Sequence, residues 1–337
     1  MEDVLGARGD PDRFSAFLSD WESVLVRRVE EAVGAFTAVE GLRGLVLAGS
    51  LGRGAQWPLS DIDLLPIYDD GQIDEAQAGI ARGRAGMLGR WAGEGWWTGL
   101  DIGNLVFSRD EVDRALGTGG PDVTSLLEDD RWYHSVDKGY QGRAVYDPLG
   151  LAAELARWFT ENRFIPPVVR LRLERARGEV AAAQSQLRGS RDPLEGTKAA
   201  RLLVKWTTIW LLESWGERDN SLGRLGTRFE RLALLRGQNE VVHALNALSG
   251  LDDASTERRM GAAPAWVWER HDRSWRARWR IGEEVSRAQD ARDVLRVCAH
   301  YEMRKVTGPP FPAWLGIPAG VEALAEDGIR VSAMVGL

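Results

Sequence analysis

The chain has 337 residues, which is enough for two domains of ordinary size and for a sizeable buried core. Hydrophobic residues make up 44% and charged residues 28%, as in folded globular proteins, and no uninterrupted apolar run reaches about 18 residues. Because the first residues are acidic and polar, neither a signal peptide nor a membrane span is expected, and we predict a cytoplasmic protein. A single cysteine, Cys298, excludes an internal disulfide, and the four histidines lack zinc-site spacing, so any metal must be held mainly by oxygen ligands.

The net charge of -7 hides an asymmetry between the two halves. Residues 1–150 carry 26 acidic and 14 basic side chains, whereas residues 151–337 carry 24 and 29. An acidic first half suits metal ions or a cationic substrate, and a basic second half suits a polyanion such as a triphosphate. Charge therefore bears on the partners of the protein rather than on its fold.

The first half has the pattern of an α/β domain with a mixed sheet. Apolar residues recur at the spacing of one helical face from position 14 to position 36, which predicts a helix over 11–36 that starts after Asp10. The elements expected next are a buried strand over 44–48, a glycine-rich turn through Gly54, a strand over 61–68, a helix over 73–91 and a strand over 97–107. Strand, turn, strand, helix and strand in this order indicate an α/β fold.

The second half has the pattern of an all-α helical bundle. After residue 148 the chain is rich in Arg, Ala, Leu and Trp at helical spacing, so we expect domains over 1–148 and 149–337. The helices expected there cover 151–162, 168–188, 196–215, 238–249, 264–287 and 289–305.

Three carboxylates mark the candidate catalytic centre. Side chains alternate faces along a strand, so Asp61 and Asp63 point to one side while Ile62 enters the core. Two carboxylates at this spacing repel each other, and a divalent cation between them would compensate for the repulsion. Asp101 lies inside the next expected strand and is the natural third carboxylate. Together they are able to hold two Mg²⁺ ions roughly 3.5 to 4 Å apart, the arrangement that supports in-line displacement at phosphorus.

The turn after the first strand suits a triphosphate. Gly49 and Ser50 allow backbone N–H groups to approach phosphate without an obstructing Cβ, and the Ser50 hydroxyl is a donor for a phosphate oxygen. Arg53 lies one turn further on and is a candidate for neutralising phosphate charge, the alternative being an exposed turn arginine.

These residues resemble a known signature. Those that carry the resemblance are Gly49, Ser50, Ser60, Asp61, Asp63, Leu64 and Leu65, which are similar to the Gly-Ser and Ser-Asp-x-Asp signature of the polymerase-β-like nucleotidyltransferase superfamily. The run SDIDLL and a helical second half are most similar to the antibiotic (aminoglycoside) adenylyltransferases. The resemblance implies that Asp61 and Asp63 bind metal and that Asp101 binds metal or deprotonates the acceptor hydroxyl. Asp101 departs from the Glu that such enzymes favour.

Two basic segments of the second half admit two interpretations each. Lys198, Arg201 and Lys205 share one face of the 196–215 helix, where they form either a solvated face or a triphosphate contact, with Lys205 the preferred nucleotide ligand. Between Trp266 and Arg280, tryptophans are interleaved with arginines. In one interpretation the tryptophans pack in the core and the arginines face solvent, and in the other the tryptophans stack on nucleic-acid bases beside arginines that contact phosphates. We expect core packing for this segment.

The sequence leaves three functional hypotheses. The leading one is Mg²⁺-dependent transfer of a nucleoside monophosphate, AMP from ATP or a group from another NTP, to a hydroxyl of a small molecule such as an amine-bearing antibiotic. In the second, the acceptor is an RNA 3′ end or a protein hydroxyl, as in toxin–antitoxin systems. The third is an antitoxin-like binding module without turnover, which Asp63→Ala would leave functional.

Overall fold

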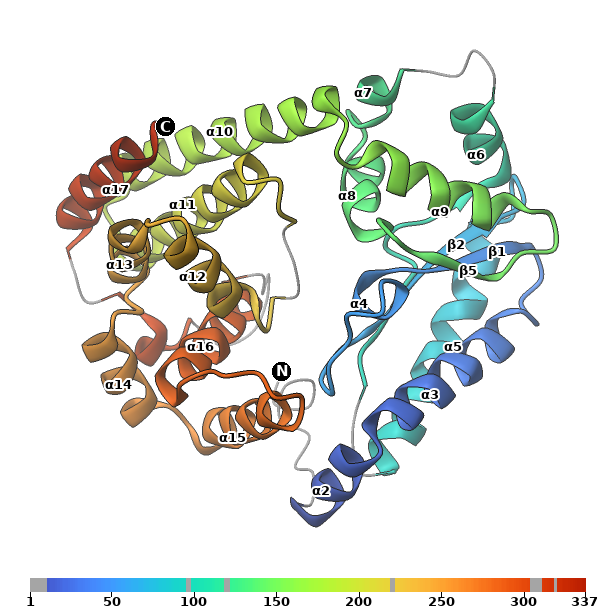
Figure 1. The fold of residues 1–337 in the computed structure, drawn as a ribbon, viewed down its shortest axis with the longest axis horizontal. Coiled ribbons are helices and arrows are strands. Elements are labelled where there is room, and N and C mark those ends of the chain that lie inside the picture. Colours follow the sequence, from blue (N-terminus) through green and yellow to red (C-terminus); the bar gives the residue numbers. More distant parts are fainter. Residues whose placement is uncertain (1–10, 95–97, 118–121, 219–221, 304–310, 318–319) are drawn as a thin grey trace. The chain divides into compact units, whose positions relative to one another are not determined.

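The fold is described from a computed structural model of the chain (Figure 1). It describes residues 11–94, 98–117, 122–218, 222–303, 311–317 and 320–337. The chain divides into two compact units, Met1–Val168 with Ala277–Gly282, and Val169–Arg276 with Glu283–Leu337. Each unit has its own core, and each is described by itself below.

The first unit is built on a mixed five-stranded sheet. Its strands are β1 (Leu42–Leu47), β2 (Ile62–Tyr68), β3 (Leu100–Ile102), β4 (Phe107–Ser108) and β5 (Arg143–Tyr146). The order is β3-β2-β1-β5, and β4 also pairs with β2. β1 is antiparallel to β2 and β5, whereas β3 and β4 run parallel to β2. The predicted 97–107 strand is therefore two shorter strands, and its first residue, 97, lies outside the described residues.

Helices cover both faces of this sheet (Figure 1). They are α2 (Pro11–Ser19), α3 (Trp21–Phe36), α4 (Gly49–Gly52), α5 (Ile73–Gly93), α6 (Arg109–Leu116), α7 (Val123–Leu126), α8 (Asp130–Lys138) and α9 (Leu151–Asn162). On one face, α3 and α5 contribute Phe36, Ile80 and Met87 to a core that also holds Ile62 and Leu64 of β2. On the other face lies α9, which packs on β1 and β5.

Two boundaries differ from the sequence prediction. The expected helix over 11–36 is broken at Asp20, whose backbone leaves the helical region (φ -129°, ψ 28°). The apolar stripe continues across the break, since Phe17 and Trp21 join one cluster with Trp57, so periodicity alone gave no sign of it. The expected domain boundary at 148 separates α9 from the sheet on which it packs, and the chain passes between units at residue 168 instead. Asp10, the predicted start signal, lies outside the described residues.

The second unit is helical in its described part, as predicted. Its helices are α10 (Pro166–Gly189), α11 (Pro193–Ser214), α12 (Leu225–Leu235), α13 (Asn239–Leu248), α14 (Asp253–Ala262), α15 (Ala265–Arg280), α16 (Arg287–Met303), the 3-10 turn η1 (Ala313–Leu315) and α17 (Val321–Val335), with α10 and α15 crossing between the units. α11 begins at an Asp192 cap that accepts from the Glu195 N–H, followed by Pro193. Cys298 is fully buried, where it packs as a small apolar residue.

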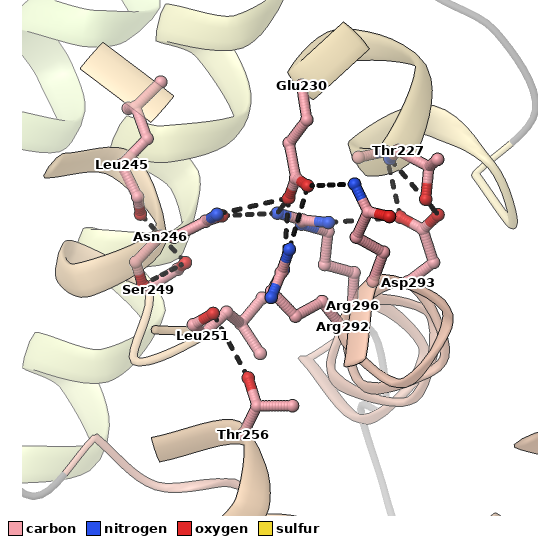
Figure 2. Close-up of polar contacts among 12 residues, drawn as sticks. Thr227, Glu230, Leu245, Asn246, Ser249, Leu251, Thr256, Arg292, Asp293 and Arg296 are labelled. Atoms are coloured by element: carbon pink, nitrogen blue, oxygen red, sulfur yellow. Dashed lines mark hydrogen bonds and ion pairs between the residues drawn. The ribbon is translucent and has the colours of Figure 1, made fainter. Parts of the chain in front are cut away.

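A buried polar network ties α12, α13 and α16 together (Figure 2). Arg292 donates from Nε and Nη2 to the two carboxylate oxygens of Glu230, at 3.1 and 2.9 Å. Asn246 donates to Glu230 at 3.1 Å and accepts from Arg296 at 2.6 Å. Because every member has a partner of complementary charge or polarity, the network fixes the register of these helices.

The prediction that α15 packs its tryptophans and solvates its arginines is confirmed for Trp266, which packs against a core cluster of the second unit, but it is wrong for other residues of the helix. Trp268 and Trp279 are 46% and 73% exposed, whereas Arg273 and Arg278 are buried. The Arg278 guanidinium stacks over the Trp57 ring with 5.8 Å to the centroid, an interaction that makes a buried arginine tenable. Among the described residues, no helix is long and apolar enough to cross a membrane.

Candidate functional site

The turn after β1 brings backbone into direct contact with a carboxylate. Gly49 has a positive φ of 63°, a conformation that favours glycine, and it starts the single turn of α4. A Cβ placed there would lie 1.8 Å from the Asp63 Oδ2 atom. Only glycine therefore fits between β1 and Asp63, and the Gly-Ser turn predicted from sequence packs against this carboxylate.

Strand pairing places two predicted carboxylates side by side. β2 and β3 are parallel, and Asp63 is the register partner of Asp101. Residues paired in this way present their side chains to the same face of a sheet on adjacent strands. Asp61 immediately precedes β2 and is exposed, whereas Asp63 is buried. The structure thus brings together Asp63, Asp101 and the Gly49 turn, with Asp61 two residues before Asp63.

Lys138 lies between the paired carboxylates, and sequence reasoning missed it. Its Nζ atom is 2.8 Å from Asp63 Oδ1 and also forms an ion pair with Asp101 Oδ2. It occupies the last turn of α8, where Gly139 follows, and a Cβ on Gly139 would lie 2.3 Å from the Phe159 ring. Glycine at this point therefore lets the end of α8 approach α9. One signal was present, because Lys138 is the only lysine in the first 150 residues.

Burial and charge separate the pKa values of the three acids. Burial, followed by the charge of Asp61, raises the pKa of Asp63 to about 7 even though Lys138 opposes the shift. Asp61 is open to solvent on one side, but the surrounding protein desolvates it and Asp101 repels it, so its pKa is also raised against the pull of Lys138. For Asp101, burial acts upward, yet Lys138 and a 2.8 Å hydrogen bond from Asn104 outweigh it and lower the pKa.

Lys138 is held as a cation. Burial acts to lower its pKa, but the charges of Asp63 and Asp101 outweigh this effect and raise it above the ordinary lysine value. Three carboxylates and one ammonium leave the cluster with excess negative charge when all are ionised. In the described ranges, no three His, Cys, Asp or Glu side chains are grouped so as to hold a metal ion as they stand. Between Asp63 and Asp101, the position for a cation is taken by the Lys138 ammonium.

The predicted phosphate-binding residues have different surroundings. The Ser50 hydroxyl donates to Ser60 Oγ at 2.9 Å, and Ser60 also accepts from the Trp57 N–H at 3.0 Å. Ser60 is buried, so it closes the 49–60 loop and positions Ser50 rather than facing a ligand. Arg53 caps α4 and is half-buried, which differs from an exposed turn arginine.

The basic residues predicted on α11 belong to the second unit. Lys205 is exposed and stacks over the Trp206 ring at 4.9 Å to the centroid, while Arg201 is buried and donates to the Leu315 carbonyl at 2.6 Å. Together with Lys198 they line a cavity inside the second unit. The solvated-face interpretation is therefore wrong for Arg201.

Comparison with known proteins adds no family to these observations. No protein-family model matches the chain, and no curated protein matches its sequence. The chemistry of the site residues is therefore the guide to function.

Proposed function

We propose that the chain is a Mg²⁺-dependent nucleotidyltransferase that transfers a nucleoside monophosphate, AMP from ATP, to a hydroxyl of a small molecule. The observation that carries the proposal is the in-register pair of Asp63 and Asp101 on parallel strands, beside a glycine turn that touches Asp63. Two adjacent carboxylates next to a glycine turn are suited to holding metal ions against a triphosphate.

The donor set fits a hard divalent cation. Mg²⁺ takes oxygen ligands, and Asp61, Asp63 and Asp101 supply carboxylate oxygens. Burial and the nearby negative charge of Asp61 raise the pKa of Asp63, and Lys138 compensates for them only in part. A divalent ion bound there would stabilise the ionised form of Asp63. When bound, the metal ions stabilise the attacking and leaving oxygens of the transfer.

The residues of the chain would have separate roles. The Gly49 turn packs against Asp63, and Ser50 would turn its hydroxyl from Ser60 to a phosphate oxygen. Asp101 lies in register with Asp63, which favours a metal-ligand role for it over that of the base. In the transfer, the acceptor oxygen bonds to the α-phosphorus, the bond from phosphorus to the pyrophosphate oxygen breaks, and the hydroxyl proton leaves with a carboxylate or water as acceptor.

The acceptor class rests on charge and resemblance. The acidic first half suits an acceptor that bears amines, and the Gly49-Ser50 and Ser60-Asp61-Ile62-Asp63 segments resemble those of aminoglycoside adenylyltransferases. An aminoglycoside-type hydroxyl is therefore the acceptor that we propose.

Transfer assays with labelled nucleotides test the proposal. Purified protein, Mg²⁺ and each labelled NTP are incubated with a panel of aminoglycosides, and both product and pyrophosphate are measured. Asp63→Asn should reduce transfer about a thousandfold or more, since it removes a metal-binding charge. The exposed Asp113→Asn on α6 is the matched control and should retain activity.

The outcomes separate the enzyme class from the acceptor. If no acceptor is labelled but Mg²⁺-ATP binds and Asp63→Asn abolishes that binding, the acceptor assignment fails alone. If Mg²⁺ binding is absent or indifferent to Asp63→Asn, the nucleotidyltransferase proposal fails.

A further inference from the structure

The second unit contains a cavity of about 430 Å³ whose lining includes none of the three candidate catalytic carboxylates. Residues of α11, α12, α13 and α16 line it, and all of them belong to this unit. Its volume falls in the range of roughly 300 to 1,000 Å³ typical of small-molecule sites. The cavity is therefore large enough for a small-molecule ligand.

Most of the lining is apolar. Leu202, Leu225, Phe229, Leu245 and Leu295 contribute side chains from four helices. Burial of an apolar ligand body against such walls is favourable at about 25 cal/mol per Å². The walls therefore suit an aromatic or aliphatic group rather than a sugar.

The charged part of the lining is basic. Lys198, Arg201 and Lys205 come from α11 at spacings of three and four residues, which is one helical face. Among the described residues, neither Asp nor Glu contributes to the lining. An ammonium-bearing ligand would be repelled here, whereas an anion would be attracted.

Arg201 is the buried member of this set. It is 7% exposed, and although Nη2 donates to the Leu315 carbonyl, Nη1 is buried and has no hydrogen-bond partner in the described part of the chain. Burial, aided by the nearby Arg259, lowers the pKa of Arg201 to about 9. The Arg201 guanidinium lies over the Phe311 ring at 5.6 Å to the centroid, but among the described residues it has no carboxylate partner. A buried cation without a carboxylate is costly, and an anionic ligand would relieve that cost.

Arg296, which α16 contributes to the cavity lining, already has acidic partners. Arg296 of α16 donates to Asp293 at 3.1 Å and to Asn246 at 2.6 Å, and it lies 3.6 Å from Glu230 (Figure 2). Excess positive charge is therefore on the α11 side. An anionic ligand group would be drawn to that side.

We propose that this cavity binds a small organic anion with an apolar body, its acidic group directed to Arg201 and Lys198 and its body lying against the leucines and Phe229. The proposal does not depend on nucleotidyl transfer. It names a ligand opposite in charge to the amine-bearing acceptor, so the two occupy different sites.

Calorimetric titration with three ligands of one shape tests the charge requirement. The probes are naphthoate, the neutral naphthamide and the cationic naphthylmethylammonium. Naphthoate should bind one per chain, and naphthamide should bind about tenfold or more weaker because it lacks the charge-assisted hydrogen bonds. Equal binding of naphthamide or of the cation, or no binding of naphthoate, overturns the proposal.

Variants then locate the binding. Arg201→Met and Lys198→Gln should each weaken naphthoate about tenfold or more with little effect on naphthamide. Ala299→Leu, which fills the cavity from α16, should weaken both ligands. The exposed Arg188→Gln on α10 is the control and should change neither. If Arg201→Met does not fold, Lys198→Gln decides, because its position is only partly buried. Unchanged naphthoate affinity in Lys198→Gln together with Ala299→Leu places binding elsewhere and refutes the assignment.

Discussion

Replacing Lys138 by methionine removes the ammonium that lies between Asp63 and Asp101 while keeping most of the side-chain volume. At the 2.8 Å separation from Asp63, the gross attraction is about 6 kcal/mol for an effective dielectric constant of about 20. Desolvation offsets much of this, and the lysine side chain is 26% exposed. We therefore expect the variant to lose about 2 to 3 kcal/mol of unfolding free energy without metal, below the range for fully buried pairs.

Magnesium should reverse this loss. In the wild type Mg²⁺ must displace the ammonium, whereas in Lys138→Met the carboxylates are left uncompensated. The Kd for Mg²⁺ should therefore fall about tenfold or more, which corresponds to about 1.4 kcal/mol or more. Stabilisation should grow with Mg²⁺ concentration by mass action.

Calorimetry of Mg²⁺ binding and thermal unfolding with and without Mg²⁺ measure both effects. Arg188→Met, an exposed arginine on α10, is the control and should leave the Kd unchanged. An equal or weaker Mg²⁺ affinity in Lys138→Met would refute the idea that the lysine holds the place of a metal.

Three further predictions concern other parts of the chain. Gly49→Ala should abolish Mg²⁺ binding and should lower the free energy of unfolding more than Gly54→Ala does. Both glycines have a positive φ, where alanine costs about 1 kcal/mol of strain, but only at position 49 would the new methyl group meet Asp63. Equal losses of stability in urea titrations would contradict this contact. Glu230→Gln should lower the free energy of unfolding by about 3 to 5 kcal/mol at neutral pH. Burial opposes ionisation of Glu230, but the arginines of α16 outweigh this effect and lower the pKa of Glu230. The stability that Glu230 contributes is therefore fully present above its ordinary pKa of 4.5 and is lost as pH falls through its lower pKa in the folded protein. A difference in stability between wild type and Glu230→Gln that does not change with pH would contradict this prediction. Burial raises the pKa of Cys298 to about 11, so its thiol should react slowly with a disulfide reagent at mildly alkaline pH until the protein unfolds, and a fast native reaction would contradict the burial.

The local pattern of β2 was readable because it depends on neighbours in sequence. Alternation along a strand predicted that Ile62 and Leu64 enter the core on the face opposite to Asp63, and both lie in the core with α3 and α5. The glycine at 49 was likewise predicted at a turn, and its positive φ agrees. Short-range geometry of this kind needs no knowledge of the remaining chain.

Arginine and tryptophan were the residues that periodicity misplaced. The rule that aromatic residues face the core and arginines face water failed for Trp268, Trp279 and Arg278. Arg201 was expected on a basic face and is instead buried in the wall of a cavity. An arginine can be buried wherever a ring or carbonyl is available to it, and sequence does not show where those partners are.

The sequence alone determined that Asp61 and Asp63 flank a core residue at the start of a strand, that a glycine turn precedes them, and that helices fill the second half. Only the tertiary structure decided that Asp101 pairs in register with Asp63 and that Lys138, 37 residues further along, lies between them. Alternation and helical periodicity arise from bond geometry within a few residues, whereas strand register and ion pairing depend on which distant segments the hydrophobic core brings together.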